Sequence, residues 1–103
     1  MSQFDVHLNP SRAGRDDRPY VLIVQTRFFD HLSTRVCAPL VREGALKPER
    51  RLNPVLRMKG RDCYFSPTEL ATLPVRMLGK PVANLEEYRD RIIAALDLVF
   101  LGI

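Results

Sequence analysis

The segment YVLIVQ, residues 20–25, carries the strongest fold signal in the chain. It is rich in β-branched side chains and almost continuously apolar, which is typical of a central strand covered on both faces. Upstream, Gln3–Leu8 alternates between polar and apolar residues and predicts a half-buried strand with His7 on its outer side. Between the two, Asn9–Pro19 contains two prolines and a glycine and is predicted to form a mobile loop.

Downstream of this segment the strand patterns are shorter and are joined by turn signals. Three further strands are predicted over Arg35–Val41, Val55–Met58 and Asp62–Phe65. Gly60 separates the last two and can supply the positive φ that a tight hairpin requires. Ser66–Glu69 has the capping residues of a short helix that continues until Pro74, and Val75–Leu78 is predicted to be a brief strand.

A longer helix is predicted near the end of the chain, with Asn84 as its cap. Its apolar residues recur at steps of three and four and form one stripe toward a core: Leu85, Tyr88, Ile92, Leu96 and Val99. Many short strands and one terminal helix predict a mainly β fold, a small curled sheet or barrel with the helix laid across it. Residues 1–103 are expected to form a single domain.

Composition limits the possible classes of protein. The chain has 103 residues, of which 46% are apolar and 27% are charged, and these values are typical of one folded domain. No apolar run approaches the roughly 18 residues of a membrane span, and the first residues lack the features of a signal peptide. We therefore expect a cytoplasmic protein that does not bind membranes.

The cysteines and the net charge add weak constraints. Cys37 and Cys63 lack the spacing of a zinc or thiol-redox site, so we expect free, buried or half-buried thiols, with no metal and no cofactor. The formal net charge is +4, from basic residues scattered along the chain. Such a surplus is typical of a solvated mixed surface, although it can also favour nucleic acid or an acidic partner.

The end of the chain is unusual because Leu98–Ile103 is apolar throughout. Only part of a helix can face its own core, so Leu98, Phe100 and Leu101 cannot all be buried together with Val99. Leaving two such side chains in water forfeits about 1.5 to 3 kcal/mol each. Either this end packs under its own sheet, or it binds a second copy or a target; we favour the second interpretation.

Phe28 and Phe29 form a second candidate apolar surface, between Arg27 and Asp30. Adjacent aromatic residues cannot face the same side of a regular element. At least one of the two is therefore expected to point outward or toward a partner, although the pair taken alone favours the core over an interface.

Several short stretches match one known family in order and spacing. They are Gln3-Phe4, Val6, Val24-Gln25, Asp30, Pro39-Leu40, Asn53-Pro54-Val55, Leu73-Pro74-Val75, Leu78-Gly79, Val82-Ala83, Leu85, Leu98, Phe100 and Gly102-Ile103. On these matches the sequence resembles the CcdB family, toxins of bacterial toxin-antitoxin modules whose best-known members poison DNA gyrase. The resemblance covers nearly the whole chain.

The resemblance implies a homodimer of small SH3-like β-barrels whose C-terminal helices meet near the dimer axis. It implies a dimer interface at Leu98, Val99, Phe100 and Leu101. It also implies a dimer that enters the A subunit of DNA gyrase and traps the enzyme with its DNA cut, by binding and without catalysis of its own. The target-contacting positions fall on Phe28, Phe29, Asp97, Phe100, Leu101, Gly102 and Ile103.

The resemblance further implies a CcdA-like antitoxin whose disordered tail covers an overlapping surface. In the family, toxin and antitoxin together bind their own operator DNA. We expect this antitoxin to be short and acidic and to meet a set of basic residues by charge complementarity. These residues are Arg42, Lys47, Arg50 and Arg51.

The chain departs from the family pattern at two positions. Leu101 stands where the well-known members have a tryptophan that stacks on a gyrase arginine, and Asp97 replaces an asparagine. Loss of such a stack costs about 0.5 to 2 kcal/mol, and loss of an anchoring tryptophan 2 kcal/mol or more. These departures favour an alternative hypothesis, in which the protein is a diverged family member that dimerises and binds antitoxin but no longer poisons gyrase.

A ribonuclease toxin on the same fold is the alternative from another class. RNA cleavage needs a general acid and base beside cations that steady the phosphate. The candidates are His7, His31, Arg12, Arg15 and Asp16, with His7 expected beside the basic loop. Because the sequence has no nucleophile elbow, phosphate-binding glycine loop or metal-ligand cluster, we do not expect an enzyme.

Overall fold

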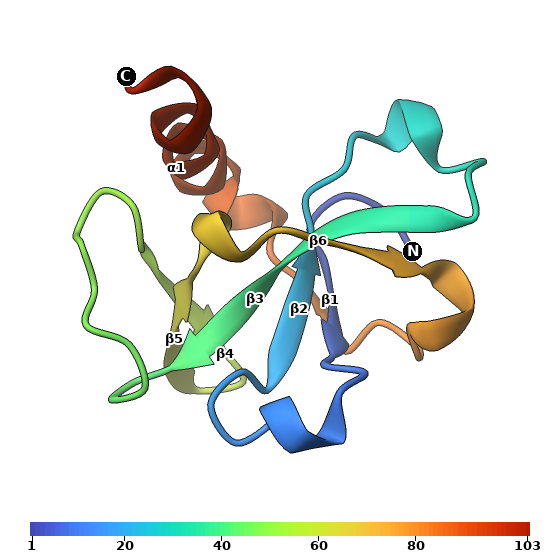
Figure 1. Cartoon of the computed structure of the whole chain (residues 1–103), viewed down its shortest axis with the longest axis horizontal. Helices are drawn as coiled ribbons and strands as arrows, with labels where there is room; N and C mark the ends of the chain where they lie inside the picture. The colour runs from blue at the N-terminus through green and yellow to red at the C-terminus, as the bar shows by residue number, and fades with distance from the viewer.

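A computed structural model describes residues 1–103, and it has a mainly β fold with one C-terminal helix, as expected. Seven antiparallel strands form one sheet that curls into a nearly closed barrel (Figure 1). The strands are β1 (Asp5–Leu8), β2 (Tyr20–Ile23), β3 (Thr34–Arg42), β4 (Val55–Met58), β5 (Arg61–Phe65), β6 (Ala71–Pro74) and β7 (Ala83–Asn84). The helix α1 spans Arg89–Leu101, and no helix is long and apolar enough to cross a membrane.

The curl of the sheet depends on β3, which is nine residues long. The strand order is β4-β5-β3-β2-β1-β7, and β6 pairs with β3 outside this path. The first half of β3 pairs with β6, from Thr34 to Cys37, and its last three residues pair with β5. Because one strand serves two neighbours along the same edge, it joins the two halves of the barrel.

The predicted hairpin between β4 and β5 is confirmed. Met58 pairs with Arg61, so only Lys59 and Gly60 form the loop. Both have positive φ, 51° for Lys59 and 80° for Gly60. Two positive φ values in a two-residue loop match the right-handed twist of the strands, and glycine adopts one of them at little steric cost.

The main core lies between the sheet and the first half of α1. It includes Phe4, Leu22 and Phe65 from the barrel, and Ile92 and Ala95 from the helix. The predicted stripe is confirmed at Leu85 and Ile92, which are buried, whereas Tyr88 and Leu96 pack against the cluster from its edge. The helix itself begins later than predicted. Asn84 belongs to β7, and its side chain accepts a hydrogen bond from the Glu86 amide at 2.9 Å, ahead of a 3₁₀ turn.

The predicted outward orientation of His7 is wrong. His7 is fully buried, whereas Leu8, predicted to face inward, is 48% exposed. The reason is that His7 shares a face of the sheet with Val21, and this face is covered by the segment that contains Leu78 and Gly79. His7 pairs with Val21, a member of a second small core, and its Nδ1 lies 2.8 Å from the Gly79 carbonyl oxygen.

Burial of His7 leads to a pH prediction. Loss of solvation lowers the pKa of its imidazole below the usual 6.5, against the opposing effect of the Gly79 carbonyl. Below pH 6.5, His7 therefore becomes protonated in the unfolded chain while it stays neutral in the folded chain. Stability contributed by the neutral ring is present above pH 6.5 and is lost as pH falls toward the lowered pKa, by at most about 1.4 kcal/mol per pH unit.

Urea unfolding between pH 7.5 and 5.5 measures this loss. The His7→Asn variant keeps a donor for the Gly79 carbonyl and does not titrate, so its stability should change less over this range. Equal pH slopes for the two proteins would contradict the assignment.

The region after β5 also differs from its prediction. The helix is a single 3₁₀ turn, Pro67–Glu69, and Ala71–Pro74 is strand β6 rather than its continuation. Each of the four residues of β6 pairs with a residue of β3 in an antiparallel ladder, and this pairing outweighs the local preference of the segment for a helix. The predicted strand at Val75–Leu78 is instead a 3₁₀ turn over Val75–Met77.

Two smaller expectations concern the Asn9–Pro19 segment and the thiols. A 3₁₀ turn forms at Arg12–Gly14, and Arg18 binds Glu69 through two bonds of 2.7 and 3.1 Å, which ties the segment to the turn after β5. Cys37 and Cys63 are free and buried, as expected. Burial raises the pKa of the Cys37 thiol to about 11, so it is an inert core residue.

Candidate partner-binding surfaces

The last turn of α1 and the residues after it form an uncovered apolar surface, which we call the C-terminal tail, Phe100–Ile103. The exposed fractions are 66% for Phe100, 66% for Leu101 and 82% for Ile103. Gly102 ends the helix with φ of 73°, and its amide donates to the Leu98 carbonyl at 3.1 Å. The tail projects away from the sheet in Figure 1, so packing under its own sheet is wrong.

The two halves of α1 have different surroundings. Ile92 and Ala95 are buried against the barrel, whereas Leu98 and Val99 are only half-buried. Asp97 is exposed and forms no ion pair. The barrel therefore covers the beginning of the helix. The end of the helix is left with a mainly apolar exposed surface and one carboxylate, that of Asp97.

A second apolar surface lies on residues 26–34, which we call the aromatic loop. Phe28 is 86% exposed and Phe29 is 49% exposed, so neither is a core residue. A 3₁₀ turn, Arg27–Phe29, holds them at the tip of the loop. Arg27 lies 3.6 Å from a carboxylate oxygen of Glu86, just before α1.

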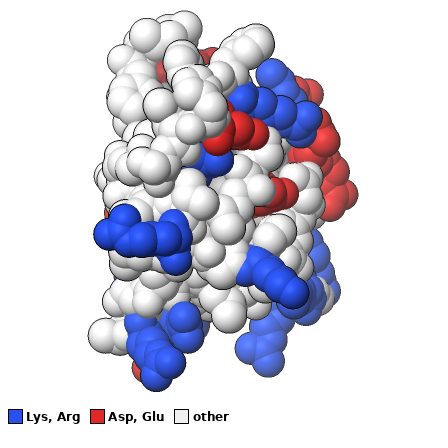
Figure 2. All heavy atoms as spheres, turned by 90° about the vertical axis from the view of Figure 1, so that its right-hand side faces the viewer, with Lys and Arg blue, Asp and Glu red and all other residues white.

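The aromatic loop and the tail lie at the same end of the molecule. In Figure 1 the two segments stand at the upper right and upper left, above the sheet. Figure 2 shows that the upper left of the face that carries the loop is largely uncharged, that basic and acidic side chains lie at its upper right, and that lysines and arginines gather over its lower part. The target-contacting positions expected from the sequence thus lie toward one end of the molecule, on two separate projections of the backbone.

A cleft of about 710 Å³ separates α1 from the segment before β4, and we call it the basic cleft. Its lining residues are Pro48, Arg50, Arg51, Asn53, Pro54, Val55, Tyr64, Arg91, Ala94, Leu98 and Ile103. The lining contains three arginines and no acidic side chain. Arg51 lies 3.9 Å from Glu49, whereas Arg50 and Arg91 form no ion pair. The cleft therefore combines an apolar floor with uncompensated positive charge.

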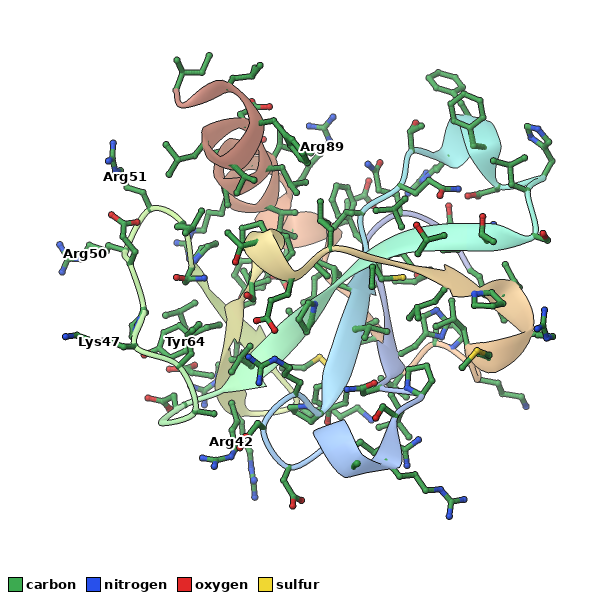
Figure 3. All side chains as sticks on the ribbon, viewed as in Figure 1. Arg42, Lys47, Arg50, Arg51, Tyr64 and Arg89 are labelled. Atoms are coloured by element: carbon green, nitrogen blue, oxygen red, sulfur yellow. The ribbon has the colours of Figure 1, made fainter.

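The structure separates the four basic residues expected to meet an antitoxin. Arg50 and Arg51 line the basic cleft together with the helix end, and Lys47 lies on the same loop (Figure 3). Arg42 lies at the end of β3, where its guanidinium contacts the Asp17 carboxylate at 3.0 Å. It lines a different cleft of about 680 Å³, in which other basic residues are interleaved with Asp16, Glu43 and Asp62.

Sequence reasoning missed Arg91 as a lining residue of the basic cleft. A signal was present, because Arg91, Ala94 and Leu98 are separated by three and four residues and so share a helix face. Arg89 lies on the other side of α1, away from the loop that carries Arg50 (Figure 3). The Arg91 guanidinium also lies over the Tyr88 ring, 5.7 Å from its centre, which helps to fix its position.

Neither histidine proposed for RNA cleavage joins Arg15 and Asp16, which line a cleft together. His7 is fully buried and its Nδ1 is engaged by the Gly79 carbonyl, so it cannot reach a phosphate at the surface. His31 is exposed on the aromatic loop, next to Phe29. No group of three His, Cys, Asp or Glu side chains is arranged to hold a metal ion.

Comparison with known protein families agrees with this arrangement of barrel, helix and apolar end. The family model described as CcdB protein matches residues 3–102, which is nearly the whole chain. The match includes every strand, the aromatic loop and the helix through Gly102. The chain therefore belongs to the CcdB family, the toxins of toxin-antitoxin modules.

Proposed function

We propose that the protein acts as a homodimer that binds the A subunit of DNA gyrase and traps the enzyme on cleaved DNA. The observation that carries this proposal is the exposed tail, Phe100–Ile103, at the end of a helix that the barrel covers only in its first half. Large exposed apolar side chains that are contiguous mark a protein interface more often than an ordinary surface.

The dimer interface is proposed to lie along the second half of α1. Leu98 and Val99 are half-buried in one subunit, and Phe100 and Leu101 are each 66% exposed, so all four have area left to bury. Burial of such side chains is worth about 1.5 to 3 kcal/mol each when it is complete. Two helix ends that meet in this way would bring both tails close together.

The gyrase contact is proposed to use the tail and the aromatic loop of each subunit. Phe28 and Phe29 offer rigid aromatic surface, and Phe100, Leu101 and Ile103 offer apolar anchors. Gly102 gives the chain the bend that turns Ile103 away from the helix. Asp97 adds an unpaired carboxylate that can meet an arginine of the target.

Trapping needs no catalysis by the toxin. A ligand shifts an equilibrium between two states only by the ratio of its affinities for them. A dimer that binds gyrase with its DNA cut more tightly than gyrase with its DNA sealed will accumulate the cut state. The gyrase active site performs the cleavage, and the toxin supplies binding energy alone.

The proposal is tested with purified protein, gyrase and supercoiled plasmid. Linear DNA should accumulate after denaturation of gyrase, and it should depend on toxin concentration in the micromolar range. Undiminished supercoiling activity without linear DNA would contradict the target assignment. Overexpression without antitoxin should also arrest the growth of a sensitive bacterium.

A CcdA-like antitoxin is the second proposed partner, and operator DNA is bound only with it. We infer that an acidic segment of this antitoxin binds in the basic cleft. Arg50 and Arg91 have no ion-pair partner there, and several of the other lining residues are apolar. Lys47 extends the positive surface along the loop (Figure 3). An acidic chain seated there would also contact Leu98 and Ile103, which line the same cleft.

Charge reversal at this cleft should weaken the antitoxin complex. We expect the double variant Arg50→Glu, Arg51→Glu to raise the dissociation constant by about 10- to 100-fold, mostly at low salt, because charges at the edge of an interface mainly govern association. Titration calorimetry at 50 and 300 mM salt measures the effect. Arg42→Glu is the matched control, since Arg42 lies outside the basic cleft and is already paired with Asp17. An unchanged dissociation constant in the double variant would exclude the cleft as the antitoxin site.

A diverged family member remains the alternative, and two residues favour it. Leu101 lacks the indole of the well-known gyrase poisons, and Asp97 replaces their asparagine. Such a protein would dimerise and bind antitoxin, yet it would produce no linear DNA in the gyrase assay.

A further inference from the structure

The inference concerns Arg35, a cation buried beneath the aromatic loop. Arg35 is only 5% exposed, and its guanidinium donates four hydrogen bonds to backbone carbonyl oxygens. Two of these carbonyls lie inside the aromatic loop, Asp30 at 2.7 Å and Leu32 at 2.7 Å, and a third is that of Thr34, where the loop meets β3, at 2.9 Å. The fourth is the carbonyl of Met1, at 3.0 Å.

The charge of Arg35 is balanced within the same loop. A carboxylate oxygen of Asp30, Oδ1, lies 3.8 Å from Arg35 Nε and has no hydrogen-bond partner of its own. The other oxygen of this carboxylate accepts a hydrogen bond from the Ser2 hydroxyl at 2.8 Å. The chain start and the aromatic loop are therefore joined at one partly buried ion pair, in which the Asp30 side chain is 35% exposed.

Other contacts of the loop are weaker or more exposed. The Gln25 amide donates to the Phe29 carbonyl at 3.2 Å, in an exposed setting, and Arg27 and Glu86 are both about 60% exposed. Phe28 and Phe29 make no contribution to either core cluster. Backbone bonds of 2.9 to 3.2 Å also hold the loop, three within its turns and one from the Val75 amide to the Ser33 carbonyl. The bonds from Arg35 to Asp30 and Leu32 are shorter, at 2.7 Å, and come from a buried side chain.

We propose that Arg35 is a positioning residue that holds Phe28 and Phe29 in a conformation ready for target binding. The proposal rests on the function proposed above. A loop of this kind without its internal bonds would sample many conformations, and a target would then have to order it on binding. Prior ordering by Arg35 removes that cost.

A guanidinium is suited to this task because it is planar and presents five donors in fixed directions. Arg35 uses its three nitrogen atoms on four carbonyls that approach from different sides. A lysine ammonium in the same place keeps the charge near Asp30 but cannot reach all four carbonyls from one point. Arg35→Lys therefore separates the ordering of the loop from the neutralisation of the carboxylate.

Hydrogen exchange of the full-length protein tests the first half of the proposal. In Arg35→Lys, the amides of Phe29, Asp30 and Leu32, which are bonded within the loop, should exchange at least tenfold faster. Amides of β2 and of the second half of β3 should keep their protection. The double variant Asp30→Asn, Arg35→Gln leaves no unpaired buried charge and should give the same local result if Arg35→Lys folds poorly.

Binding to the isolated gyrase A subunit tests the second half. Arg35→Lys should bind at least tenfold more weakly than the unmodified protein. Arg18→Lys is the matched control, because it also breaks a two-bond arginine contact but lies at Glu69, outside the aromatic loop. This control should leave both the exchange of the loop and gyrase binding unchanged.

The outcomes separate the possible errors. Unchanged exchange in the loop of both Arg35 variants would overturn the positioning role. Faster exchange with gyrase affinity within twofold of the original would overturn the role in recognition. If the unmodified protein does not bind gyrase, the proposed function fails, and the exchange result alone decides whether Arg35 orders the loop.

Discussion

Deletion of the C-terminal tail, Phe100–Ile103, is expected to abolish growth arrest and gyrase-dependent DNA cleavage. The deleted residues include three side chains that are 66% exposed or more, and none belongs to a core cluster. Anchoring residues at the centre of an interface are worth about 2 kcal/mol or more each. Loss of several anchors from both subunits should weaken the gyrase complex by more than about 1,000-fold, since each 1.4 kcal/mol is a factor of ten.

The deletion should leave the barrel folded. Ile92 and Ala95, which carry the contact between helix and core, are retained, and the β2–β3 pairing does not involve the deleted segment. Circular dichroism and exchange of the β2 and β3 amides measure this directly. Met77→Gln is the matched control, because Met77 is an exposed apolar residue, 51% accessible, on a different turn.

The control variant should poison gyrase as the unmodified protein does. Retention of growth arrest by the folded deletion variant would show that the tail is dispensable. The assignment of the tail as the target-binding surface would then be wrong.

Substitution of Leu101 by tryptophan is expected to strengthen gyrase trapping by about 10- to 1,000-fold. An indole stacked on an arginine contributes roughly 0.5 to 2 kcal/mol, and a tryptophan in an anchoring position contributes 2 kcal/mol or more. The dimer gains this contact twice. The folded subunit can accept the larger side chain without strain, because Leu101 is 66% exposed and lies outside both core clusters.

The toxin concentration that gives half-maximal linear DNA measures this gain. Leu101→Ala is the companion variant and should shift the concentration in the opposite direction, since it removes apolar area at the same site. The pair thus distinguishes a specific indole contact from a general perturbation of the helix end. An identical concentration for tryptophan, leucine and alanine would place residue 101 outside the gyrase contact.

The parts of the fold that sequence predicted well are those with local causes. The central strand β2 has its signal in its own apolar residues, and the β4–β5 turn has its signal in Gly60, whose φ is 80°. The parts that failed depend on distant neighbours. Ala71–Pro74 becomes a strand only because β3 offers an edge, and His7 is buried beside Gly79, which is 72 residues away in the chain.

The same distinction applies to the candidate surfaces. The apolar tail is visible in the sequence because the last six residues of the chain, Leu98–Ile103, form one apolar run. The basic cleft is not, because it forms between Arg50 and Arg91, which belong to a loop and a helix far apart in the chain. In the sequence Arg35 has no feature that distinguishes it from an ordinary strand residue, because the four carbonyls that converge on it are brought together only by the fold.

Sedimentation velocity of the full-length chain at micromolar concentration tests most directly whether the exposed helix end is covered by another polypeptide. The account predicts a single species with twice the mass of the 11.8 kDa chain. It also predicts that deletion of Phe100–Ile103 shifts the protein toward the monomer. A stable monomer over the same concentration range, indifferent to the deletion, would contradict the account.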